Sequence, residues 1–140
     1  MSAVAIITSW VNLGEETSPQ PRPSTAPGRA ATDKKRRAFF AADFCWHVPG
    51  DTDLSGPYAG EAYFTEMPAR MMPLDEWSVD IEHFAANSDL VVAVGRIRGR
   101  RLGRVIDAAG GHVFRFDSES KVVEAWGWCA EQDQLDTFFA

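Results

Sequence analysis

The feature that most constrains the fold of this chain is a series of strand-like segments that fills its second half. From Trp77 onward, apolar and polar residues alternate, which is the pattern of half-buried β-strands. The part before Trp77 instead carries helical spacings of apolar residues. Helices followed by a strand meander predict an α+β protein, with helices packed on one face of a curved antiparallel sheet. The expected strands are 77–84, 90–98, 105–117 and 122–129.

The first half of the chain contains the expected helices and a proline-rich segment. Ser18–Thr32 holds four of the eight prolines, a composition typical of a flexible linker or disordered loop. The predicted organisation is an N-terminal helix within residues 1–17, a linker or loop at 18–32 and one α+β domain at 33–140. Pro68 should kink or split the third helix. The expected helices are 3–16, 33–42, 61–72 and 134–139, with a short strand at 44–48.

Length and charge limit the classes of function. A chain of 140 residues predicts one structural domain with a core large enough for a small cavity. The net charge of −6 gives no electrostatic support for nucleic-acid binding. Met1–Val11 lacks a basic n-region and is too short to span a bilayer, so we expect a cytoplasmic protein without a membrane anchor. Cys45 and Cys129 form no CxxC motif and are expected to be reduced and buried.

The short strand 44–48 carries a histidine close to its end, because Pro49-Gly50 should terminate the strand. Strand alternation puts Cys45 and His47 on one face and Phe44, Trp46 and Val48 on the other. A histidine beside a strand end is well placed to line a cavity mouth and to titrate near neutral pH. His47 is therefore a candidate for acid–base chemistry.

A second histidine lies within the long strand 105–117. His112 shares a face with Phe114 and Phe116, which indicates that this face is buried. In such surroundings His112 is either a satisfied core residue or a site residue. The third histidine, His83, shares its predicted face with Trp77 and is interpreted as structural or as secondary to the site.

No pattern in the sequence predicts a metal or a cofactor. The chain has no HxH, HExxH, GxSxG, P-loop or GxGxxG motif. Asp107 has the opposite strand parity to His112, unless the Ala-Ala-Gly-Gly run at 108–111 forms a bulge that turns it inward. Trp126 and Trp128 share one face of the last strand with Glu124, where they either line a pocket or close the core.

Three segments together resemble the SnoaL-like family within the nuclear transport factor 2-like superfamily. AFFAADFCWHVPGDTDLSGPYAG (38–60) is similar to the family's opening helix and strand, HVFRFDSESKVVEAWGW (112–128) to its closing hairpin, and EQDQLDTFFA (131–140) to its last helix. The resemblance implies a cone of curved antiparallel sheet, with helices packed on its concave side and an apolar pocket inside. It also implies a homodimer.

The resemblance assigns roles to particular residues. It places the general-base position of ketosteroid isomerase on His47 and its protonated-acid position on His112, although neither is a carboxylate here. In polyketide cyclases of the family an acidic residue pairs with a histidine, and Asp107 is the carboxylate that would correspond. The residues implied to shape the pocket are Trp126, Trp128, Phe114, Phe116, Tyr58 and Tyr63.

The expected function is a cofactor-free cyclase or isomerase that acts on a small apolar carbonyl compound, such as a polyketide intermediate. His47 would remove a proton next to the carbonyl, and His112 would donate to the enolate oxygen. One alternative is a non-catalytic ligand-binding or dimeric interaction module of the same fold. A further alternative, a dehydratase or epoxide hydrolase, requires a carboxylate and a histidine within hydrogen-bond reach.

Overall fold

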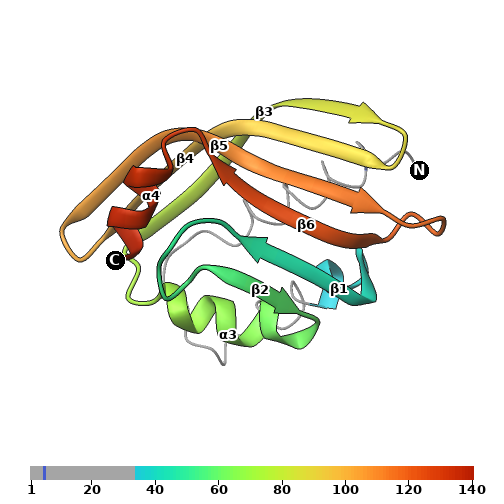
Figure 1. The fold of residues 1–140 in the computed structure, drawn as a ribbon, viewed down its shortest axis with the longest axis horizontal. Helices are drawn as coiled ribbons and strands as arrows, with labels where there is room; N and C mark the ends of the chain where they lie inside the picture. The colour runs from blue at the N-terminus through green and yellow to red at the C-terminus, as the bar shows by residue number, and fades with distance from the viewer. Residues whose placement is uncertain (1–4, 6–33) are drawn as a thin grey trace.

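The computed structural model describes residue 5 and residues 34–140, and Figure 1 draws the remaining residues as a thin grey trace. The expected helix at 3–16 and the linker at 18–32 therefore lie outside the described residues, as does the boundary between them. No helix in the described part of the chain is long and apolar enough to cross a membrane.

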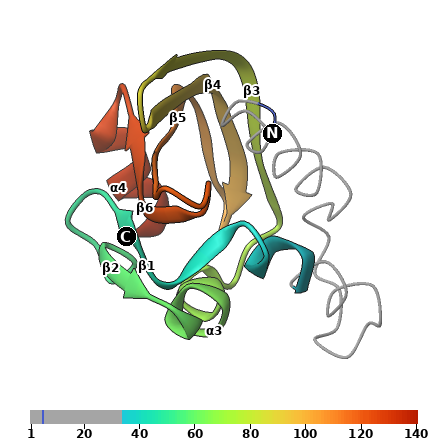
Figure 2. The same cartoon turned by 90° about the vertical axis from the view of Figure 1, so that its right-hand side faces the viewer.

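Six strands form one curved, unclosed sheet (Figures 1 and 2). Their spatial order is β2-β1-β6-β5-β4-β3. Neighbours are antiparallel except β1 and β6, which run parallel. The strands are β1 (Phe40–Val48), β2 (Gly56–Ala59), β3 (Glu76–Asn87), β4 (Leu90–Arg101), β5 (Arg104–Phe116) and β6 (Val122–Cys129). The meander predicted from alternation is thus confirmed as β3 to β6.

Two helices pack on one face of this sheet, which we call the inner face. From α3 (Glu61–Met71), the Tyr63 ring lies 4.7 Å from the ring of Trp46 on β1. From α4 (Gln132–Phe139), Phe138 lies against Gly99 on β4, where an added Cβ would come within 2.9 Å of the Phe138 ring. The opposite side of the sheet is the outer face. The core therefore lies between the inner face and the helices.

Arg101 fixes both helices to the end of β4. Its side chain is buried, and its guanidinium donates to the carbonyl oxygens of Met71 in α3 and Phe138 in α4, at 3.2 Å and 3.3 Å. Cations are favourable near helix C-termini, where carbonyl groups lack intrahelical partners. The hydrogen bonds compensate for burying this charge.

The predicted helix at 33–42 is wrong over its second half. Residues 34–37 are helical, but β1 begins at Phe40. Phe40 pairs with Val122 of β6, and its ring stacks on Phe44 at 4.2 Å. Pairing with β6 and aromatic packing override the local helical pattern, because strand formation depends on context.

Two further local predictions also need correction. α3 is a single helix that contains Pro68, so the proline does not split it. In β3 a register shift between Ile81 and His83 moves His83 off the face of Trp77 and leaves it exposed.

Candidate functional site

The two candidate histidines lie on opposite faces of the sheet. His47 of β1 pairs with Trp126 of β6, which in turn pairs with Val113 of β5, so these three side chains share the outer face. His112 immediately follows Gly111 and precedes Val113, and strand alternation turns it to the inner face. The structure therefore does not bring the two imidazoles together.

His112 lies among aromatic rings on the inner face. Its ring centroid is 5.1 Å from that of Trp46 and 5.7 Å from that of Phe114. The residue keeps some accessible surface, while its Nδ1 atom is buried. Burial penalises the charged imidazolium and lowers the pKa of His112 to about 4. At neutral pH the ring is therefore uncharged, with one nitrogen carrying a hydrogen and the other a lone pair.

The predicted pocket residues divide between the two faces. Phe114 and Tyr63 contact the Trp46 ring next to His112, and Phe116 is also part of the buried core. Tyr58 is only 1% exposed, and its hydroxyl donates to the Leu54 carbonyl oxygen at 2.6 Å. Tyr58 therefore anchors the loop before β2 in addition to filling the core.

Trp126 and Trp128 lie on the outer face, so the sequence-based assignment of both to an inner pocket is wrong. They pair with Val113 and Gly111, the two residues that flank His112 on β5 and whose positions face the opposite side of the sheet. The indole of Trp128 lies over Gly111, where an added Cβ would be 3.4 Å from its Nε1. Trp126 and Trp128 do share one face of β6, as alternation predicted. The buried face, however, is the opposite one, which carries Ala125.

Asp107 also lies on the outer face, contrary to the inward orientation that a bulge would have produced. The pairing of β4 with β5 continues without a shift through residues 108–111. The Asp107 side chain is 53% exposed, and its Oδ1 lies 2.6 Å from Arg96 Nε and 3.7 Å from Arg98 Nε. Cross-strand arginines on β4 thus hold this carboxylate outside the core.

The outer face carries a carboxylate–histidine pair that the sequence analysis did not single out. Glu124 Oε2 lies 2.8 Å from His47 Nε2, and the other Glu124 oxygen binds Arg115. The His47 ring also stacks on Trp126, with centroids 5.5 Å apart and an interplanar angle of 12°. The parity of Glu124 with Trp126 was visible in the sequence, but the pairing of β6 with β1 was not.

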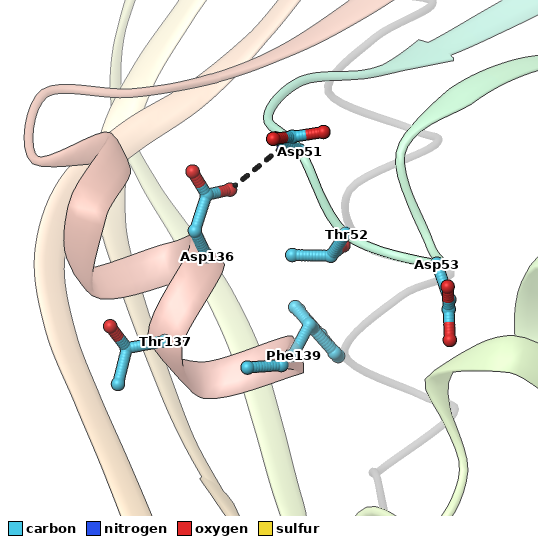
Figure 3. A pocket seen from close by; sticks show the side chains of 7 residues that line it. Asp51, Thr52, Asp53, Asp136, Thr137 and Phe139 are labelled. Carbon is cyan, nitrogen blue, oxygen red and sulfur yellow. Dashed lines mark hydrogen bonds between the residues drawn. The ribbon is translucent and has the colours of Figure 1, made fainter.

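An open hollow of about 410 Å³ lies between the loop after β1 and α4 (Figure 3). Asp136 accepts a hydrogen bond from the backbone N–H of Asp51 at 3.3 Å, which links the two walls. None of the site residues predicted from the sequence lines this hollow. Among residue 5 and residues 34–140, no group of three or more His, Cys, Asp or Glu side chains is arranged to hold a metal ion. The hollow is lined by Asp51, Thr52, Asp53, Asp136, Thr137, Phe139 and Ala140.

A model of the SnoaL-like domain matches residues 29–125 of the chain. The chain belongs to the SnoaL-like family. This confirms the resemblance seen in the sequence. No curated protein sequence matches this SnoaL-like chain significantly.

Solved structures with the same fold include proteins named NTF2-like and SnoaL-like. An NTF2-like protein from Burkholderia xenovorans LB400 is 20% identical with a TM-score of 0.74, over 99% of this chain and 95% of that chain. TerC, co-crystallised with polyporic acid, is 15% identical with a TM-score of 0.74, over 98% and 97%. A candidate SnoaL-like polyketide cyclase from Jannaschia sp. CCS1 is 14% identical with a TM-score of 0.68, over 99% and 92%. These similarities show the fold of the SnoaL-like chain.

The geometry gives this SnoaL-like protein two chemically distinct histidines. His112 is an uncharged imidazole in aromatic surroundings, where a hydrogen bond to a ligand is stronger than in water. His47 is partly exposed and is oriented by Glu124. The first can polarise an apolar ligand on the inner face, whereas the second can act only on a solute that reaches the outer face.

Proposed function

We propose that this SnoaL-like protein is a cofactor-free cyclase or isomerase, and that it binds a small apolar carbonyl compound such as a polyketide intermediate against His112. The observation that carries the proposal is the uncharged His112 ring beside Trp46 and Phe114. Membership of a family with structural neighbours named as candidate polyketide cyclases supports the same reaction class.

In this proposal His112 donates its N–H to the carbonyl oxygen as negative charge develops there. A neutral imidazole is suited to this role, because it supplies a hydrogen without bringing a charge into an aromatic environment. Its low pKa makes it a weak proton acceptor at neutral pH, so His112 is assigned the donor role only. His47 is not assigned the base role, since its ring faces the other side of the sheet, and the proton next to the carbonyl passes to solvent water instead.

The test is exchange of the protons next to the carbonyl of a small apolar ketone in D₂O, followed by NMR. Wild type is compared with His112→Phe, which keeps an aromatic ring, and with His83→Gln, which changes an exposed histidine on β3. We expect protein-dependent exchange in wild type and His83→Gln, and loss of exchange in His112→Phe. Unchanged exchange in His112→Phe, with the fold intact by circular dichroism, would contradict the donor role.

The second candidate is a non-catalytic module that binds the same class of ligand. One observation favours it. Of the three predicted catalytic residues, His47 and Asp107 lie on the outer face, so His112 alone of these three lies on the inner face. Saturable binding of the ketone that weakens in His112→Phe, without any proton exchange in wild type, would support this module over the enzyme.

We also propose that two copies of the chain associate through the outer face of β4 and β5. The support is a strip of partly buried apolar side chains across β4, β5 and β6, with His47 of β1 at its edge. It is formed by Val92, Val94, Val113, Trp126 and Trp128. Apolar interface centres surrounded by polar rims are common in protein pairs. Sedimentation should give twice the chain mass for wild type and the chain mass for Val113→Lys, while wild type sedimenting as a single chain would contradict this pairing.

A further inference from the structure

Three charged or titratable side chains from three strands form a continuous chain of contacts on the outer face. Arg115 of β5 binds one oxygen of Glu124 of β6, and the other oxygen lies 2.8 Å from His47 Nε2 of β1. The parallel pairing of β1 with β6 places His47 beside Trp126, whose ring supports one side of the imidazole. We call Arg115, Glu124 and His47 the outer-face relay.

The relay fixes the chemical form and direction of the imidazole. A carboxylate can only accept a hydrogen bond, so Nε2 carries a hydrogen, and in the uncharged ring Nδ1 keeps its lone pair. The His47 side chain makes no other hydrogen bond within the described part of the chain, and 33% of its surface is exposed. Nδ1 is therefore the nitrogen that a solute can approach.

We propose that His47 Nδ1 is a nucleophile that accepts acyl groups from small activated esters and passes them to water. The arrangement shares the logic of a hydrolase in which a carboxylate orients a histidine, except that the imidazole itself attacks. This activity is independent of the function proposed for the inner face, because the two sites lie on opposite sides of the sheet.

The reaction balances with water as the only co-reactant. The Nδ1 lone pair forms a bond to the ester carbonyl carbon, and the bond from that carbon to the leaving oxygen breaks. As the ring becomes an acylimidazole, the Nε2 proton moves to Glu124, and the leaving alkoxide or aryloxide takes up a proton from solvent. Water then attacks the acyl carbon, and the bond from that carbon to Nδ1 breaks. The carboxylic acid leaves, one proton of the attacking water passes to solvent, and Glu124 returns its proton to Nε2.

The chain contains a matched control histidine for this proposal. His83 on β3 is exposed but forms no ion pair or hydrogen bond with a carboxylate in the described part of the chain. It therefore reports the reactivity of an ordinary exposed imidazole. His112 is unsuitable as a control because it contacts the inner aromatic rings.

The experiment measures p-nitrophenolate release from p-nitrophenyl acetate by the full chain. We expect the protein-dependent rate to fall at least about tenfold in His47→Gln and to change less than twofold in His83→Gln. An acetyl group on the peptide that contains His47, trapped by acid quenching and located by mass spectrometry, should accompany turnover. Equal rates in wild type and His47→Gln, or equal losses in both histidine variants, would overturn the proposal.

Glu124→Gln tests the relay itself. An amide can replace the carboxylate in shape, but it cannot take the Nε2 proton, so the rate should fall about tenfold and its pH profile should shift. Urea unfolding of the same variants separates this effect from stability. A Glu124→Gln protein that is less stable but keeps the wild-type rate and pH profile would show that the relay is only structural, and would overturn the role assigned to Glu124.

Discussion

The low pKa of His112 predicts a specific dependence of stability on pH. The folded state holds this ring uncharged with a pKa of about 4, while the unfolded chain exposes an ordinary histidine with a pKa of about 6.5. Between these values the unfolded state binds more protons than the folded state, so the free energy of unfolding falls as pH falls. The contribution of His112 to the free energy of unfolding is fully present above about pH 6.5 and fully lost below about pH 4.

The size of the effect follows from the pKa difference. A shift of about 2.5 pKa units corresponds to about 3 kcal/mol over the whole range, of which roughly 2 kcal/mol is lost between about pH 7.5 and pH 5. His112→Phe removes the titrating ring and keeps an aromatic side chain beside Trp46 and Phe114. The variant should therefore lose less stability than wild type as the solution is acidified.

The assay is urea unfolding of wild type, His112→Phe and the control His83→Gln at a series of pH values. Carboxylates titrate in all three proteins, so the informative quantity is the difference from wild type at each pH. We expect this difference to change by roughly 2 kcal/mol between about pH 7.5 and pH 5 for His112→Phe and to stay constant for a surface control. Parallel curves for wild type and His112→Phe, or an NMR titration of the His112 ring near pH 6.5, would refute the reasoning.

Three further predictions test the packing of the sheet. Gly95→Ala should destabilise the protein by about 1–3 kcal/mol in urea unfolding, because an added Cβ would lie 1.9 Å from the Asp80 carbonyl oxygen. Phe114→Ala should cost about 3–5 kcal/mol, since its side chain is 1% exposed, whereas Val105→Ala at 69% exposure should stay within about 0.5 kcal/mol. Arg101→Ala should lower the thermal midpoint more than Arg101→Met, which retains packing after the hydrogen bonds to the helix ends are lost.

The order of β3 to β6 and the parity within most strands could be predicted from the sequence, whereas β2 and the face of His83 could not. Alternation is a local property, so it identified β3 to β6 and correctly placed His112 with Phe114. It also placed His47 opposite Phe44 and Trp46, which are two of the buried side chains of β1. The more apolar face of β1 was therefore already a signal that His47 points outward.

Which residues of different strands meet on the same face of the sheet could not be predicted in the same way. His47 and Glu124 meet because β1 pairs with β6 in parallel, and this register depends on contacts between residues far apart in the sequence. For Asp107 a signal did exist, because arginines at alternate positions on β4 indicated a polar outer face that would hold its carboxylate. The glycine run beside it allowed a bulge but did not require one.

The parallel pairing of β1 with β6 also has a consequence for how the polypeptide acquires its shape during synthesis. The hairpins of β3, β4 and β5 join neighbouring stretches and can form as soon as those stretches leave the ribosome. β1 can pair early with β2, but its other edge must wait for β6, about 80 residues downstream. We expect nascent chains that end before β6 to expose the aromatic side of β1, and so to be recognised by chaperones until the last strand emerges.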